Sequence, residues 1–76
     1  MLKTEDIVRL ILDGAEITSA RGRNQWQIAG VDVLTQTLLN WENNHYIQRD
    51  FRRFDADKEL YKLTELGRES LARIYF

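Results

Sequence analysis

The chain lacks several residue types, and each absence excludes a class of site. Its 76 residues include no cysteine, no proline, one histidine and four glycines. Without cysteine, neither a disulfide nor a thiolate metal site can stabilise the fold. With a single histidine and no glycine-rich phosphate loop, the usual catalytic groups are nearly missing, so we do not expect an enzyme, a metal site or a cofactor.

The chain also lacks long apolar runs and an excess of one charge. No run approaches the roughly 18 residues of a membrane span, and the amino terminus has no signal-peptide pattern, so we expect a cytoplasmic protein without membrane contact. Eleven Lys and Arg residues oppose twelve Asp and Glu residues. Only a local basic cluster could therefore bind a polyanion. A chain this short buries about 60% of its unfolded surface, which predicts one small domain over residues 1–76.

The most regular pattern in the chain predicts a helix over about 32–44. Leu34, Leu38 and Trp41 recur at helical spacing and give this helix an apolar side. Asp32 is expected to cap its first turn, because a carboxylate can accept from the unpaired amides there.

The opposite side of this helix carries the amides Gln36, Asn40 and Asn43. After them, Asn44 and His45 tolerate a positive φ better than most residues, which predicts a sharp turn into a strand. The helix is therefore anchored on one side and free to contact a partner on the other.

A first helix is predicted before this region. Thr4 can cap it, Ile7, Leu10 and Ile11 form its buried stripe, and Asp13-Gly14 ends it. We expect this helix to belong to the core.

Two interpretations fit residues 15–30. One is a short extended entry through Ile17, followed by a helix that is capped near Ser19 and ended by Gly30. The other is a hairpin with its turn at 21–24, since residues 25–28 alternate polar and apolar. Gly22 inside the helix would cost about 1 kcal/mol relative to alanine.

A hairpin and a last helix are predicted after the central helix. Tyr46–Phe54 alternates and is rich in aromatic residues, which predicts a strand; 55–58 is a polar turn, and 60–63 returns as a second strand. Thr64 then caps a final helix, with Gly67, Leu71 and Ile74 on one side of it. An acidic alternation at 55–59 lacks the glycine and the distal glutamate of a calcium loop, so we expect no calcium site.

Two segments resemble winged-helix transcription regulators of the MarR and PadR kinds. Residues 41–49, Trp-Glu-Asn-Asn-His-Tyr-Ile-Gln-Arg, resemble the Leu-Glu-x-x-Gly-Tyr-Ile-x-Arg junction between recognition helix and wing. Residues 61–68, Tyr-Lys-Leu-Thr-Glu-Leu-Gly-Arg, resemble the Tyr-x-Leu-Thr-x-x-Gly entry into the last helix. The chain departs from these patterns at Trp41, at His45 and in a short turn after Ala29.

The resemblance implies an α+β winged-helix domain. It would contain a three-helix core, a recognition helix at about 32–44, a two-stranded wing at about 46–63 and a C-terminal helix. It also favours the helical interpretation of 15–30, because Ile28-Ala29 would end the first helix of a helix-turn-helix.

The function that the resemblance implies is sequence-specific binding of double-stranded DNA in transcriptional regulation. Amide and hydroxyl groups on the central helix would read base edges, and arginines would contact phosphates. The candidate DNA-binding residues are Thr35, Gln36, Asn40, Arg49, Arg52, Arg53, Arg21 and Arg23.

Two further expectations follow. The apolar tail Ile74, Tyr75 and Phe76 either closes over the core or contacts a second copy, and the resemblance implies a homodimer. The balanced charge favours an alternative function, a winged helix that binds another protein and not DNA.

Overall fold

The described part of the chain forms three helices and five strands. The structure is a computed structural model that describes residues 3–22 and 24–76. In chain order the elements are α1 (Thr4–Leu12), β1 (Ile17–Ala20), β2 (Trp26–Ile28), β3 (Val31–Val33), α2 (Thr35–Asn43), β4 (Ile47–Arg49), β5 (Lys58–Leu63) and α3 (Glu65–Tyr75).

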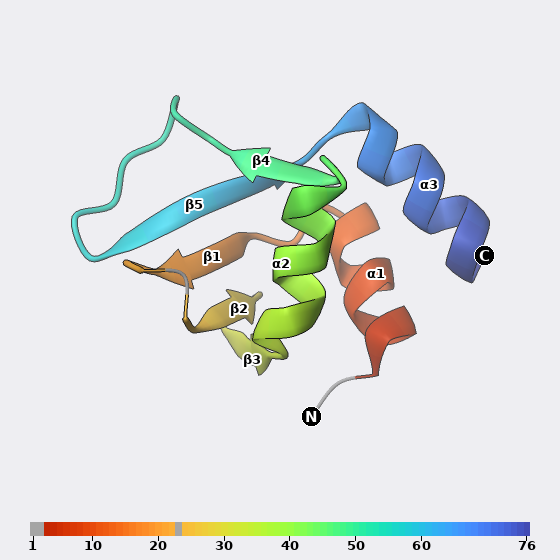
Figure 1. The fold of residues 1–76 in the computed structure, drawn as a ribbon, viewed down its shortest axis with the longest axis horizontal. Helices are drawn as coiled ribbons and strands as arrows, with labels where there is room; N and C mark the ends of the chain where they lie inside the picture. Colours follow the sequence, from red (N-terminus) through yellow and green to blue (C-terminus); the bar gives the residue numbers. More distant parts are fainter. Residues whose placement is uncertain (1–2, 23) are drawn as a thin grey trace.

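All five strands pair in one antiparallel sheet, in the order β3, β2, β1, β5, β4. The central strand is β1, in which Ile17 lies opposite Ile28 of β2 and Tyr61 of β5. Figure 1 shows the strands toward the left, α3 at the far right, and α1 and α2 between them.

The face of the sheet that carries Ile17, Trp26, Ile28 and Tyr61 meets the helices. Successive strand residues point to opposite faces, so these four side chains share one side. The rings of Trp26 and Tyr61 lie 4.7 Å apart. The helices add the apolar residues Ile7, Val8 and Ile11 of α1, Leu38 and Trp41 of α2, and Leu71 of α3. Each large side chain buried in this way contributes about 1.5–3 kcal/mol, which holds the short strands together.

The first helix belongs to the core, as predicted, but its predicted cap is wrong. Ile7 and Ile11 are buried, and Asp13 follows the last helical residue. Thr4 is the first helical residue, and the N-cap position belongs to Lys3, which makes no side-chain capping bond.

Residues 15–30 form a hairpin, so the helix favoured by the resemblance is wrong. Strands β1 and β2 pair antiparallel, with Thr18 opposite Gln27. The physical reason is the period of the apolar residues: Trp26 and Ile28 are both buried, with the half-buried Gln27 between them. A helix would have scattered these side chains around its axis. Arg23 lies outside the described residues.

The domain is α+β, but it is not a winged helix, and the resemblance to MarR and PadR regulators is wrong as a guide to the fold. Strands β1 and β2 occupy the region where a helix-turn-helix needs its first helix. Strand β5 pairs with β1 as well as with β4, so the two strands β4 and β5 belong to the five-stranded sheet and do not form a separate wing.

The central helix starts later than predicted, at Thr35. Asp32 lies in β3 and does not cap the helix; its carboxylate accepts a hydrogen bond of 2.9 Å from Gln27 of β2. The valines on either side of Asp32 favour the extended backbone of a strand. Leu34 takes the N-cap position and is 54% exposed, whereas Leu38 is buried as predicted.

The turn after α2 is predicted correctly and is held by the start of α3. His45 has a φ of +63°. The Thr64 hydroxyl donates to the His45 carbonyl at 2.6 Å, and its oxygen accepts from the Gly67 amide at 2.9 Å. Thr64 is therefore the predicted cap of the last helix, and it also ties that helix to the turn. Gly67 lies so close to Tyr46 that a Cβ atom would overlap the Tyr46 carbonyl.

The strand predicted over Tyr46–Phe54 is too long. Strand β4 ends at Arg49, and the pairing ends where the Asp50 amide donates to the Leu60 carbonyl at 2.9 Å. Asp50 then accepts from the Arg52 amide at 3.1 Å, which turns the chain out of the sheet. Residues 50–57 therefore form a loop between β4 and β5.

Candidate functional site

The outer side of α2 consists of amides. Gln36, Asn40 and Asn43 are its three exposed residues, and all three are uncharged. The Gln36 Nε2 atom donates to Asn40 Oδ1 at 3.0 Å, as expected for side chains four residues apart on a helix. A solvent-facing helix usually carries charged side chains, so an exposed side made only of amides is suited to contact a partner.

Thr35 is a positioning residue at the start of this helix. Its side chain is half-buried, and its hydroxyl donates to the Asn24 carbonyl at 3.2 Å. The hydroxyl therefore ties α2 to the β1–β2 connection, and Thr35 lies one residue from Gln36.

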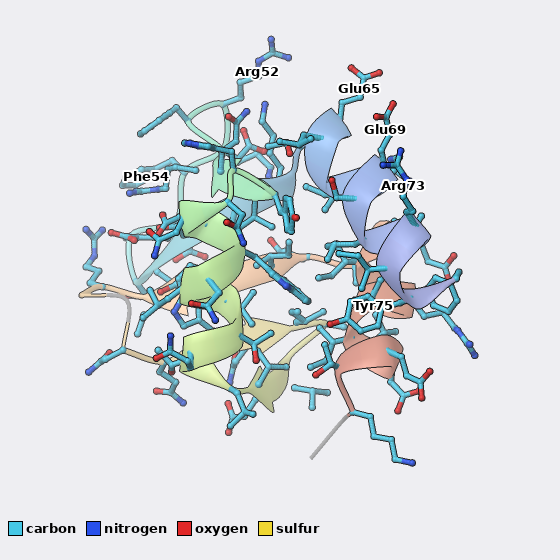
Figure 2. The ribbon with its side chains drawn as sticks, turned by 45° about the vertical axis from the view of Figure 1, so that its right-hand side comes forward. Arg52, Phe54, Glu65, Glu69, Arg73 and Tyr75 are labelled. Carbon is cyan, nitrogen blue, oxygen red and sulfur yellow. The ribbon has the colours of Figure 1, made fainter. Side chains whose placement is uncertain are left out.

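The β4–β5 loop carries two exposed aromatic rings. Phe51 is 86% exposed and Phe54 is 85% exposed. The guanidinium of Arg49 lies 5.5 Å from the centre of the Phe51 ring, in a cation–π arrangement. Figure 2 shows Arg52 and Phe54 projecting away from the ribbon at the loop. The loop thus presents apolar and cationic groups together.

Two of the predicted arginines, Arg49 and Arg53, form ion pairs within the chain. Arg49 forms an ion pair with Glu59 at 3.3 Å. Arg53 forms ion pairs with Asp50 at 2.9 Å and with Glu16 at 3.4 Å. These two side chains therefore add little net positive charge to the surface.

Two other arginines predicted to bind DNA, Arg21 and Arg52, keep their charge available. Arg21 donates from Nε and Nη2 to the Ala56 carbonyl, at 3.0 and 2.6 Å, which holds it beside the β4–β5 loop. Arg52 makes no ion pair with any described residue, although its backbone amide is bonded to Asp50. Arg23 lies outside the described part of the chain.

Asp50 stabilises the base of the loop as a carboxylate. Burial opposes its ionisation, but the Arg52 amide, the hydrogen bond and charge of Arg53 and the charge of Lys62 outweigh burial, so the pKa of Asp50 lies below its ordinary value of 3.8. The side chain accepts two hydrogen bonds within the loop. At neutral pH, the ionised Asp50 carboxylate therefore holds the Arg52 amide and the Arg53 side chain at the base of the loop.

No family model, curated protein or solved structure matches the chain.

Across 3–22 and 24–76, no group of three or more histidine or carboxylate side chains is placed to hold a metal ion. Over the same ranges, no helix is long and apolar enough to cross a bilayer.

The structure brings some of the predicted residues together and separates others. Gln36 and Asn40 are neighbours on α2, whereas Arg21 and Arg52 lie at the β4–β5 loop. The predicted tail is split, because Ile74 and Phe76 are exposed while Tyr75 packs against the core. In Figure 2, Tyr75 is turned inward from α3.

The exposed rings Phe51 and Phe54 were missed by the sequence analysis, which placed both in a strand. The sequence does contain a signal for a loop here, because Asp50 and Asp55 flank the segment and aspartate favours turns. Both aspartates accept a hydrogen bond from the amide two residues later, at 3.1 and 2.8 Å.

Proposed function

We propose that this domain binds double-stranded DNA through the amide side of α2 and the β4–β5 loop. The observation that carries the proposal is that every exposed residue of α2 is an amide: Gln36, Asn40 and Asn43. Amides are the side chains that pair bidentately with adenine in the major groove, and that groove, about 12 Å wide, admits a helix. A role in transcriptional regulation would follow from sequence-specific binding.

The hydrogen bond between Gln36 and Asn40 supports base reading. It engages Gln36 Nε2 and Asn40 Oδ1. Gln36 Oε1 and Asn40 Nδ2 remain as one acceptor and one donor on the exposed side. Adenine offers a donor at N6 and an acceptor at N7 in the major groove, so the pair has the complementary polarity.

Contacts with phosphates are expected to be few. Arg49 and Arg53 are neutralised by carboxylates, which leaves Arg21 and Arg52 as the described arginines with available charge at the loop. Each phosphate neutralised by a protein cation lowers the slope of log K against log salt by about 0.9. Affinity for one copy should therefore be modest and only moderately sensitive to salt.

Two variants separate the proposed roles. Arg52→Ala should weaken binding to all duplexes alike, because a phosphate contact carries no sequence information. Gln36→Ala should change which sequences are enriched from a random duplex library. Lys3→Ala is the matched control: it removes one charge at the amino-terminal end of α1, which lies away from the loop (Figure 1). If Arg52→Ala and Lys3→Ala weaken binding equally, the assigned surface is wrong.

A protein-binding function is the second candidate, and the exposed rings of Phe51 and Phe54 favour it. Aromatic side chains and arginine are enriched at the centres of protein interfaces. A photo-crosslinking residue at position 54 would capture a protein partner in cells, whereas the same residue at position 3 would not. Capture at position 54 together with no DNA binding by the purified chain would favour this candidate over DNA.

A further inference from the structure

The outer side of α3 combines exposed apolar and charged residues. Leu66 is 51% exposed and Ile74 is 62% exposed, and Ser70 lies midway between them. Figure 2 shows Glu69 and Arg73 along the outer side of the same helix, pointing away from the rest of the molecule. Residues three or four apart are neighbours on one side of a helix, so these five side chains form one stripe.

We propose that this α3 stripe, defined as Leu66, Glu69, Ser70, Arg73 and Ile74, binds the same stripe of a second copy in antiparallel orientation. A two-fold axis requires a surface that is complementary to itself. With Ser70 at the axis, Leu66 of each copy lies opposite Ile74 of the other, since both are four residues from Ser70. The small side chain of Ser70 lets the two helices approach closely where they cross.

The charges select the antiparallel arrangement and a second copy as the partner. Glu69 and Arg73 are exposed and make no ion pair with any described residue. In the antiparallel pair, Glu69 of each copy lies near Arg73 of the other, which gives two symmetric attractions. A parallel pair would instead place Glu69 against Glu69 and Arg73 against Arg73. The stripe therefore complements itself in one orientation.

The last two residues, Tyr75 and Phe76, already make contacts within the same chain. The guanidinium of Arg9 lies 5.1 Å from the centre of the Phe76 ring, and Tyr75 packs against the core. Pairing through α3 would therefore rest on Leu66 and Ile74 more than on the last two residues. The β4–β5 loop lies at the opposite end of the molecule from α3 (Figure 1). A dimer of this form leaves the proposed DNA surface of both copies free.

Charge reversal at two exposed positions tests this pairing. Sedimentation equilibrium of the full chain across a concentration series should show a monomer–dimer equilibrium. Glu69→Arg alone should place two guanidinium groups against each other, one from each copy, and weaken the dimer about tenfold. Arg73→Glu alone should weaken it by a similar factor, because two carboxylates then face each other across the interface.

Two rescue experiments distinguish the loss of contacts between copies from damage to the fold of one copy. The double variant Glu69→Arg/Arg73→Glu should restore the wild-type dimerisation constant, because the same two attractions form with reversed sign. An equimolar mixture of the two single variants should also dimerise as heterodimers. Lys3→Glu is the control, since it reverses a charge outside the stripe and should leave dimerisation unchanged.

Several results would overturn the inference. These are a wild-type chain that stays monomeric at every concentration, single variants that dimerise as well as the wild type, or a double variant that stays as weak as the single ones. The inference does not rest on DNA binding, because sedimentation without DNA measures it alone. Circular dichroism of each variant checks that the fold is kept.

Discussion

Gly67 is packed against the backbone of Tyr46, at the point where the turn after α2 meets the start of α3. A Cβ atom at position 67 would overlap the Tyr46 carbonyl group, so either the turn or the helix would have to move. We expect Gly67→Ala to destabilise the domain by about 3 kcal/mol, at the upper end of overpacking costs. Urea denaturation at low protein concentration would measure this.

The control for Gly67 is Glu69→Ala, an exposed position on the same helix. Substitutions at exposed positions usually change stability by less than about 0.5 kcal/mol. An alanine at position 67 that leaves the domain as stable as the wild type would show that α3 does not pack on the turn as described.

The Asp50 carboxylate is expected to make the domain sensitive to acid. Because its pKa in the folded state lies below the ordinary 3.8, its contribution to stability is present above pH 3.8 and is lost as the pH falls through the folded-state pKa. A carboxyl-carbon NMR titration should give a midpoint below 3.8 for Asp50. Arg53→Ala should move that midpoint upward, since it removes a hydrogen bond and a positive charge. An unchanged midpoint would contradict the loop geometry.

At the scale of elements, replacing alanine by asparagine tests the turn between β2 and β3. The substitution should stabilise a tight hairpin turn and destabilise a helix. Ala29 and Gly30 both have positive φ, at 53° and 79°. Two consecutive residues of this kind form the type I′ turn of a tight hairpin, which favours Asn-Gly. Alanine is strained in this conformation, so we expect Ala29→Asn to stabilise the domain by about 0.5–1 kcal/mol.

The same substitution in a helix should have the opposite effect. Ala72→Asn, within α3, should destabilise the domain by about 0.7 kcal/mol, because asparagine is a poorer helix former than alanine. Thermal denaturation of both variants gives the comparison. Destabilisation by Ala29→Asn would favour the helical interpretation of this segment over the hairpin.

The elements that the sequence predicts well are those with a long apolar repeat or a local cap. The buried stripe of α1, the buried Leu38 and Trp41 of α2, the turn at His45 and the Thr64 cap all follow from neighbouring residues. Strands β2 and β3 have three residues each, and an alternation this short does not by itself exclude a helix. Their conformation depends on pairing with strands elsewhere in the sheet.

The start of α2 also depends on strand pairing that the local sequence does not show. Asp32 is a good cap by residue type, but pairing of β3 with β2 places it in a strand opposite Gln27. The resemblance to winged helices favoured a helix over 15–30, although its two segments, 41–49 and 61–68, both lie after the start of α2.

For the whole molecule, the candidate surface was only partly predictable. The amide side of α2 follows from helical spacing alone. Whether the arginines are paired does not follow from the sequence. Glu59 neutralises Arg49 and Glu16 neutralises Arg53 because distant strands and loops meet in space. A chain with a net charge of −1 and paired arginines can bind DNA only through a few contacts. Dimerisation through α3 would double those contacts.

We propose that the domain binds DNA through α2 and the β4–β5 loop with few phosphate contacts. Fluorescence anisotropy of a random-sequence duplex, titrated with the wild-type chain over a salt series, tests it most directly. We expect measurable binding at low salt, and a slope of log K against log salt of about −2 for each bound chain, from Arg21 and Arg52. No binding at low salt, or binding that Arg52→Ala leaves unchanged, would contradict the claim.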